Sequence, residues 1–447
     1  MNPASLFSTR LVRAATVCDA AYDGVILVTS CGKIVEETPK LKVLSSAILD
    51  FIEFHRGALT SANIVPVDKK IIPSGRLVLA GTGPVTRDID DVRRFHTAAK
   101  NGVKLALSAG IKSPLLVTVP HPRYPHAELV SALGALLPLY TPLNVREEEK
   151  NEKFQKFGLL PIMSEHLVEL VEAFDAAFTV CRDVGETGPE RMSPPRVADY
   201  IKARLVRLEY NGSGTVENTY FMVGKGVTID TGTFRFSSSC GCDLKTGGHM
   251  WGMCRDKYGS AIVAGFFKVL EILKPKNLKA IGYMCMVRNS IGSNAYTCDE
   301  VITSRSGKRI HIYNTDAEGR LTMLDPLTRA KEEAMKEVNP HLMTIATLTG
   351  HEFISYGYYA AFMDNGPAKQ SGWTRRIQDT GDRYGQPIEI SRLQPEGSRL
   401  DEHGCDSEHP LKFTHIDMGC AAGDYPDASF PNPLVTLVAD LILSKSR

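Results

Sequence analysis

Acidic and basic side chains alternate in the segment Asn314-Thr315-Asp316-Ala317-Glu318-Gly319-Arg320-Leu321. The segment follows a β-rich stretch at 309–313, and in an extended chain every second side chain lies on the same face. Asp316, Glu318 and Arg320 would then bring two carboxylates and a cation together. An isolated Asp-x-Glu-x-Arg is more often a salt-bridged strand end at the surface, so this segment alone does not predict a site.

Two further segments place a lysine and two acids at the ends of expected elements. Lys225 and Asp230 lie at the end of an expected strand, in a turn bordered by glycines, and Asp256 lies just before an expected helix. Four carboxylates in one cleft would repel one another unless cations balance them. Two divalent ions would balance them if Lys225 bound as a neutral amine. The four carboxylates are those of Asp230, Asp256, Asp316 and Glu318.

The elements that position these residues belong to the second of two expected domains. A chain of 447 residues exceeds the roughly 250–300 residues at which one core stops growing. We place the boundary after the polar run 146–153, which gives an N-terminal α/β domain at 1–160 and a C-terminal α/β domain at 165–447. A strong amphipathic helix beginning near Leu167 would bridge the two domains.

Both domains alternate apolar strands with amphipathic helices, which is typical of mostly parallel, mixed sheets flanked by helices. In such sheets, ligands bind in the crevice beyond the carboxyl ends of the strands. The strands are expected at 24–30, 76–81, 115–119, 205–210, 220–223, 280–287 and 342–348, and the helices at 88–110, 126–140, 167–181, 259–273 and 326–338.

The composition excludes several classes of protein. With 52 Lys plus Arg against 51 Asp plus Glu, the net charge of +1 does not support a nucleic-acid or anionic-membrane partner. No apolar run reaches the roughly 18 residues of a membrane span. The ten cysteines contain no Cys-x-x-Cys pair and are typical of reduced cytosolic thiols, so we expect a cytoplasmic protein.

Several familiar catalytic motifs are incomplete. His351-Glu352 is followed by Ser355 where a zinc protease needs its second histidine, and no Gly-x-Ser-x-Gly elbow is present. Gly224-Lys225-Gly226 lacks the spacing of a phosphate-binding loop, and Gly81-Thr82-Gly83 lacks the third glycine of a dinucleotide fingerprint. Serine hydrolase, nucleotidase and dehydrogenase activities are therefore disfavoured.

The chain resembles the leucyl (cytosol) aminopeptidase family, whose members are di-metal exopeptidases that assemble as hexamers. The block Asn314–Leu321 matches the signature of that family without a substitution. Further matches are Gly224 to Asp230, Lys245 to Asp256, Ile345 to Gly350 and Thr414 to Asp417. The resemblance covers about 165–447, and the N-terminal third fits the family only in its pattern of elements.

The resemblance implies a role for each matching residue. Lys245 would be the catalytic lysine that polarises the scissile carbonyl, and Arg320 would hold a bicarbonate-like base. The Leu348 backbone would orient the substrate. The pocket for the first side chain would be lined by Met253, Thr347 and Gly350, and the metal ligands would be Lys225, Asp230, Asp256, Asp316 and Glu318.

These roles fit a two-metal hydrolysis of peptides with a free N-terminus. Two divalent ions about 3.5–4 Å apart can bridge and acidify a water while they bind the amine and the carbonyl oxygen of the substrate. Carboxylates with one nitrogen and no thiolate suit zinc or manganese. A cationic Lys245 would stabilise the developing oxyanion. We therefore expect a cytosolic, homo-oligomeric metalloprotease with aminopeptidase activity.

Three departures from the family pattern keep a second hypothesis open. An insertion at 233–240 separates Asp230 from Lys245, and only 202–204 joins two elements that are tens of residues apart in the family. The small-residue helix expected between 394–396 and 400–402 is missing. A catalytically impaired member that acts as a structural or binding subunit is the alternative.

Overall fold

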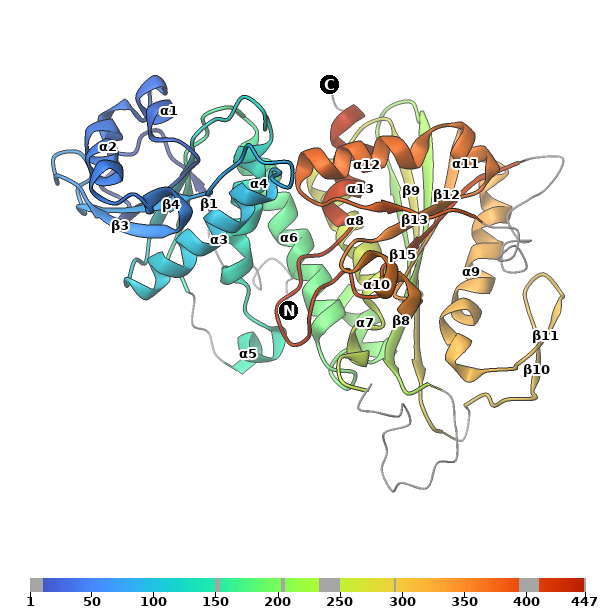
Figure 1. Ribbon diagram of the computed structural model, residues 1–447. Helices are drawn as coiled ribbons and strands as arrows, with labels where there is room; N and C mark the ends of the chain where they lie inside the picture. Colours follow the sequence, from blue (N-terminus) through green and yellow to red (C-terminus); the bar gives the residue numbers. More distant parts are fainter. Residues whose placement is uncertain are drawn as a thin grey trace. The chain divides into compact units, whose positions relative to one another are not determined.

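The computed structural model describes residues 11–148, 153–201, 206–232, 250–292, 295–393 and 410–445 (Figure 1). The chain divides into two compact units. One unit comprises Met1–Ala176 and Gly381–Gln386, and the other comprises Ala177–Thr380 and Pro387–Arg447. The division falls inside helix α6 (Leu167–Glu186), and the sequence-based boundary at 160–165 stays a prediction.

The first unit is built on a six-stranded sheet with the order β1-β6-β5-β2-β4-β3. All its described strand pairs are parallel except β3 with β4. The strands are β1 (Leu11–Arg13), β2 (Gly24–Thr29), β3 (Ala62–Pro66), β4 (Arg76–Gly81), β5 (Pro114–Thr118) and β6 (Phe157–Leu159). The α-helices are α1 (Gly32–Glu37), α2 (Ser45–Phe54), α3 (Arg93–Ser108), α4 (Ala127–Leu136) and α5 (Leu143–Glu148), and the 3₁₀ helices are Lys42–Leu44, Ala58–Thr60 and Leu137–Leu139.

Helices cover both faces of this sheet, which explains why its central strands are apolar without interruption. Val25 and Leu27 of β2 pack with Val35 of α1 and Ile48 of α2. On the opposite face, Gly102 lets α3 approach β2 closely, because a Cβ there would lie 2.8 Å from a side-chain atom of Ile26. The sequence predicted β2, β4 and β5 within two residues and also predicted α3 and α4, but it did not predict β1, β3 or β6.

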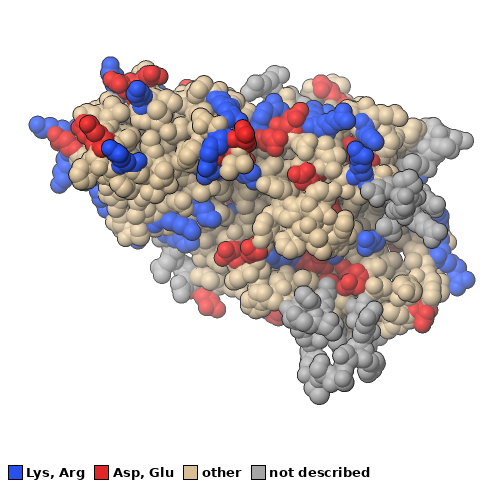
Figure 2. All heavy atoms as spheres, viewed as in Figure 1, with Lys and Arg blue, Asp and Glu red and all other residues tan. Residues whose placement is uncertain are grey.

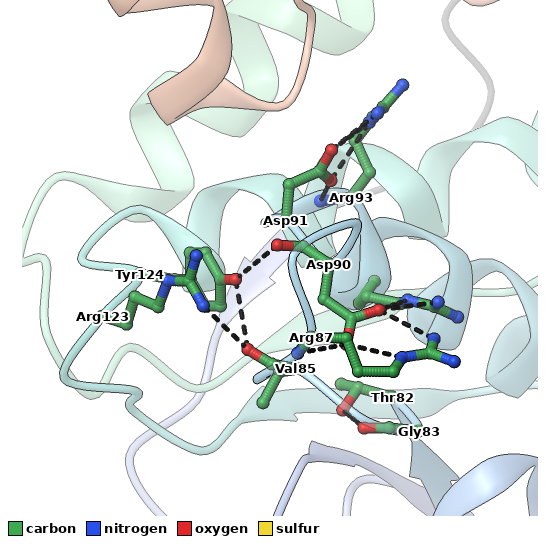
Figure 3. Close-up of polar contacts among 10 residues, drawn as sticks. Thr82, Gly83, Val85, Arg87, Asp90, Asp91, Arg93, Arg123 and Tyr124 are labelled. Atoms are coloured by element: carbon green, nitrogen blue, oxygen red, sulfur yellow. Dashed lines mark hydrogen bonds and ion pairs between the residues drawn. The ribbon is translucent and has the colours of Figure 1, made fainter.

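A buried carboxylate holds the loop between β4 and α3 (Figure 3). Asp90 accepts hydrogen bonds from Arg87 at 2.8 Å and from Arg94 at 3.0 Å, and the hydrogen bond from Arg87 lowers the pKa of this carboxyl. The Tyr124 hydroxyl donates to the Asp90 carbonyl at 3.0 Å. These contacts fix the chain beyond the Gly81-Thr82-Gly83 turn.

The second unit contains a seven-stranded mixed sheet with the order β14-β13-β15-β12-β8-β9-β7 (Figure 1). The central strands β15, β12, β8 and β9 run parallel, while β13 pairs antiparallel with β15 and β7 antiparallel with β9. The strands are β7 (Arg207–Asn211), β8 (Asn218–Asp230), β9 (Leu278–Asn289), β12 (Pro340–Ala346), β13 (Ala361–Asp364), β14 (Glu389–Ile390) and β15 (Lys412–Asp417), with a separate hairpin of β10 (Val301–Thr303) and β11 (Arg309–His311).

Helices also cover both faces of the second sheet. On one face, Phe221 and Val223 of β8 pack with Met323 of α9. On the other face, Gly224 lies against the start of α8. The α-helices are α7 (Pro194–Ile201), α8 (Tyr258–Leu273), α9 (Glu318–Ala334), α10 (Gly350–Tyr356), α11 (Gly366–Gln370), α12 (Trp373–Tyr384) and α13 (Leu434–Leu441), and the 3₁₀ helices are η5 (Met253–Arg255), η6 (Thr315–Ala317) and η8 (Leu443–Lys445). The predicted α/β class with a mostly parallel mixed sheet is confirmed.

The surface carries both signs of charge. Figure 2 shows Lys and Arg interspersed with Asp and Glu over the visible face, in keeping with the formal net charge of +1. Among the described residues, no helix combines the length and the apolar character that a membrane crossing requires. The seven described cysteines are free thiols.

Replacement of Gly224 by Ala should destabilise the second unit. The added Cβ would lie 2.7 Å from the Gly259 carbonyl oxygen and 2.7 Å from Ser260 Cα. These are backbone atoms, which cannot relieve a clash by changing rotamer as a side chain can. We expect a loss of about 1–3 kcal/mol in the free energy of unfolding, measured by urea denaturation. Gly188→Ala is the control, because a Cβ at Gly188 has no neighbour within 4 Å among the described residues. Equal stability of the two variants would contradict this close packing.

Candidate metal centre

Three acidic side chains meet beside the carboxyl edge of the parallel strands in the second sheet. Asp230 is the last residue of β8, Asp256 follows η5, and Glu318 is the first residue of α9. A carboxylate oxygen from each lies within 4.8 Å of the other two, and each residue is at most 9% exposed. This is the crevice in which the sequence predicted a ligand site.

Lys225 supplies the positive charge at the centre of this group. Its Nζ lies 2.8 Å from Asp256 Oδ1 and 2.8 Å from Glu318 Oε1, and it donates to the Thr347 carbonyl oxygen at 2.8 Å. Gly319 makes room for the lysine, because a Cβ there would lie 2.7 Å from Lys225 Cε. One buried ammonium therefore contacts two of the three carboxylates.

The expectation that Lys225 lies in a turn at a strand end is wrong, because β8 continues to Asp230. The flanking glycines allow close packing within the strand rather than a turn. A Cβ at Gly224 would meet the start of α8, and one at Gly226 would lie 2.6 Å from Met286 Sδ. Because the glycines face away from α9, Lys225 lies on the α9 side with Phe221 and Val223.

A β-bulge brings Asp230 to the same side of the sheet as Lys225. Val227 pairs with Val287 but Asp230 pairs with Asn289, so β8 contains one extra residue between these pairs. The extra residue reverses the alternation and turns Asp230 toward the site. Asn289 Nδ2 donates to Asp230 Oδ1 at 2.7 Å and to the Thr315 carbonyl at 3.0 Å, which holds the carboxylate in place.

The segment Asn314–Leu321 is helical rather than extended, which corrects the expected geometry of its charged residues. The Asn314 side chain accepts from the Asp316 N–H at 2.9 Å and caps η6, and α9 begins directly afterwards at Glu318. Glu318 is consequently buried, whereas Asp316 and Arg320 are exposed. Asp316 lies outside the group of three carboxylates.

Burial controls the protonation of these residues. It raises the pKa of Asp256 to about 7, although Lys225 acts in the opposite direction, and it also raises the pKa of Glu318. Burial would lower the pKa of Lys225, but the charges of Asp256 and Glu318 outweigh it and raise that pKa. The lysine is therefore an ammonium in the metal-free protein, and the carboxyls compete for it.

The donor set fits divalent metal ions. Asp256 Oδ2 and Glu318 Oε2 are buried and have no hydrogen-bond partner among the described residues, although each belongs to a carboxyl whose other oxygen contacts Lys225. Buried carboxylate oxygens without donors are costly, and a cation would satisfy them. Oxygen ligands with one nitrogen suit zinc, manganese or magnesium.

The turn after β12 connects the carboxylates to β15. The Thr347 hydroxyl donates to Asp256 Oδ1 at 2.7 Å, and the Thr347 carbonyl accepts from Lys225. Asp417 accepts from the Leu348 N–H at 3.1 Å and from the Thr349 hydroxyl at 2.6 Å. The sequence identified Thr347 and the segment ending at Asp417, but it did not reveal that Asp417 and Asn289 position the site.

The structure describes some of the remaining predicted residues but not all of them. Lys245 lies outside the described residues, as does the insertion at 233–240. Met253 lies in η5, three residues before Asp256, and Gly350 is the first residue of α10. Their roles in binding a substrate stay predictions.

The sequence is similar to known aminopeptidases. Residues 181–394 match the family described as "Cytosol aminopeptidase family, catalytic domain". The Caenorhabditis elegans protein named "Putative aminopeptidase W07G4.4" is 56% identical over 527 aligned positions, with 99% of each chain covered. Because this chain has 447 residues, at least 80 of those positions carry no residue of it.

Several solved structures share the fold. The apo leucyl aminopeptidase from Trypanosoma cruzi matches with a TM-score of 0.77 at 17% identity, covering 98% of this chain and 99% of that chain. The bottromycin maturation enzyme BotP in complex with Mn matches with a TM-score of 0.70 at 19% identity, covering 94% of this chain and 98% of that chain. Both matches show similarity in the two-domain fold.

The stability of the metal-free protein should fall as the pH rises from about 4 to about 7. The pKa of Asp256 is raised in the folded state, so the unfolded chain loses this proton first and folding becomes less favourable up to about pH 7. Thermal unfolding in the presence of a chelator measures the effect. The Asp256→Asn variant should show a flatter dependence, and an identical slope would contradict the assignment.

Proposed function

The chain belongs to the cytosol aminopeptidase family, and from this premise we propose that it is a metal-dependent aminopeptidase that releases the N-terminal residue of peptides. The observation that carries the proposal is the meeting of Lys225 with the buried carboxylates of Asp230, Asp256 and Glu318. All three acids match positions that the resemblance identifies as metal ligands.

Two divalent ions would be held by Lys225 and the three clustered acids, together with Asp316, which the family resemblance adds. When bound, the ions would polarise the scissile carbonyl and acidify a water that attacks it. Zinc and manganese are both proposed, and the manganese complex of the fold neighbour BotP supports the second. The five proposed ligands are Lys225, Asp230, Asp256, Asp316 and Glu318.

Lys225 must change its protonation state to serve as a ligand. Its Nζ donates to three oxygens as an ammonium, and a lone pair for metal binding becomes available only when one proton leaves. The Thr347 carbonyl would keep one of the remaining N–H groups and hold the amine toward the site. Metal binding would therefore release protons.

The remaining roles follow from the family resemblance. Lys245 would stabilise the oxyanion, and Arg320 would hold bicarbonate as a base near the site. Met253, Thr347 and Gly350 would line the pocket for the first side chain. The Leu348 backbone, which is fixed by the hydrogen bond from its N–H to Asp417, would align the peptide.

We also propose that the protein is a cytoplasmic homo-oligomer, and a hexamer by family resemblance. The free thiols of the described cysteines support a reducing compartment. Size-exclusion chromatography with light scattering measures the assembly directly.

Purified protein with added manganese or zinc should hydrolyse a leucyl amide. Glu318→Gln should lower kcat/KM at least about 10²-fold, because a ligand carboxylate is lost while the side chain keeps its shape. Glu271→Gln is the control, since this glutamate is exposed on α8. A folded sample that binds metal but shows no turnover would contradict the proposal.

A second candidate is a binding or structural subunit without catalysis. The 80 or more aligned positions that lack a residue of this chain support it, together with the three departures from the family pattern. Metal stoichiometry measured by mass spectrometry separates the candidates. About two ions per chain supports the enzyme, and none supports the subunit.

A further inference from the structure

One peptide bond beside the metal centre is held at both of its polar groups. The carbonyl oxygen of Thr315 accepts hydrogen bonds from Asn289 Nδ2 at 3.0 Å and from the Tyr296 hydroxyl at 2.8 Å. The N–H of the same peptide bond belongs to Asp316 and donates to Asn314 Oδ1 at 2.9 Å. Because a peptide bond is planar, these three hydrogen bonds fix the orientation of the whole peptide unit.

This peptide unit lies directly before two of the proposed metal ligands. Its orientation constrains the direction in which the Asp316 side chain leaves the backbone, and Glu318 follows as the first residue of α9. Asp316 is exposed and lies outside the group of three carboxylates. An exposed side chain is not held by packing in a core, so the position of Asp316 depends on how firmly the backbone before it is held.

Tyr296 reaches this peptide unit from the segment that follows β9, and its side chain is half-buried. Burial raises the pKa of its hydroxyl above the usual value, and the charges of Glu318, Asp230 and Asp316 raise this pKa further. The hydroxyl therefore keeps its proton and acts as a donor. Because it donates to the Thr315 carbonyl, Tyr296 would act on the metal centre through the backbone.

The two donors to the Thr315 carbonyl differ in their further contacts. Asn289 is 8% exposed, and its Nδ2 also donates to Asp230 Oδ1 at 2.7 Å. Loss of the Asn289 side chain would therefore disturb Asp230 and Thr315 together. Loss of the Tyr296 hydroxyl would instead weaken the hold on the Thr315 carbonyl while the contact between Asn289 and Asp230 remains. Tyr296 is consequently the residue at which the orientation of this peptide unit is best tested.

We propose that Tyr296 is a positioning residue for metal binding, which holds the Thr315–Asp316 peptide unit so that the Asp316 carboxylate reaches a bound ion. The inference rests on the proposed function, because Asp316 is a proposed ligand only through the family resemblance. Loss of a group that orients a metal ligand typically lowers metal affinity or activity about 10–100-fold. Tyr296 would have this effect without contacting the ion.

Manganese titration of the metal-free full chain by isothermal calorimetry tests the proposal. Tyr296→Phe removes only the hydroxyl oxygen, and we expect at least one of the two ions to bind about 10–100-fold more weakly than in the wild-type protein. Hydrolysis of a leucyl amide by this variant should recover toward the wild-type rate when the manganese concentration is raised by the same factor.

Tyr210→Phe is the matched control. Tyr210 is also half-buried, and its hydroxyl also donates to a backbone carbonyl, that of Pro275, at 2.7 Å. It pairs with Ala280 near the start of β9, whereas Asn289 is the last residue of that strand. Tyr210→Phe therefore loses the same kind of hydrogen bond at the opposite end of the sheet, and it should bind manganese as the wild-type protein does.

The outcomes separate a positioning role from a merely structural one. If Tyr296 only stabilised the fold, Tyr296→Phe would unfold at a lower temperature but bind manganese with wild-type affinity, which would overturn this inference and leave the proposed function intact. An equal loss of affinity in Tyr210→Phe would also overturn it. A wild-type protein that binds manganese without turnover would contradict the proposed function alone, and the comparison of affinities would still decide the role of Tyr296.

Discussion

The structure of the second unit depends on one electrostatic constraint, which is that a single buried ammonium is shared among crowded carboxyls. Removing such charges from water costs several kcal/mol per ion unless partners compensate. Lys225 contacts two of the carboxylates, and an oxygen of each of these two has no donor among the described residues. This incomplete compensation would be relieved by a bound cation.

The two faces of β8 differ in the side chains that they carry and in the elements that they contact. On one face, Gly224 allows the start of α8 to pack directly on the strand. On the other face, Lys225 extends toward α9, and the bulge before Asp230 adds a second charged side chain to that side. Asn289 and Thr347 then hold the carboxylates through hydrogen bonds from uncharged donors.

The face of the sheet that carries Lys225 combines a packed core with an open space. Phe221 and Val223 of β8 pack with Met323 of α9, and a cavity of about 900 Å³ is lined by residues of β12, β15 and β13 among others. The proposed metal ligands and this cavity therefore lie on adjacent parts of one layer. Asp417 connects them, because it holds the Leu348–Thr349 backbone beside the cavity and next to the metal centre.

The sequence by itself determined the α/β class, seven of the strands and the three acids that meet in the structure, because apolar periodicity and short motifs are local properties. The seven strands are β2, β4, β5, β7, β8, β9 and β12. The sequence did not determine that the Asn314–Leu321 block is helical, since alternating charges fit a strand as well as a helix start. Only the tertiary structure decided that Asp316 is exposed, that a bulge turns Asp230, and that Asn289 and Asp417 position the site. These outcomes depend on strand register and on contacts between residues far apart in the chain, which local patterns do not contain.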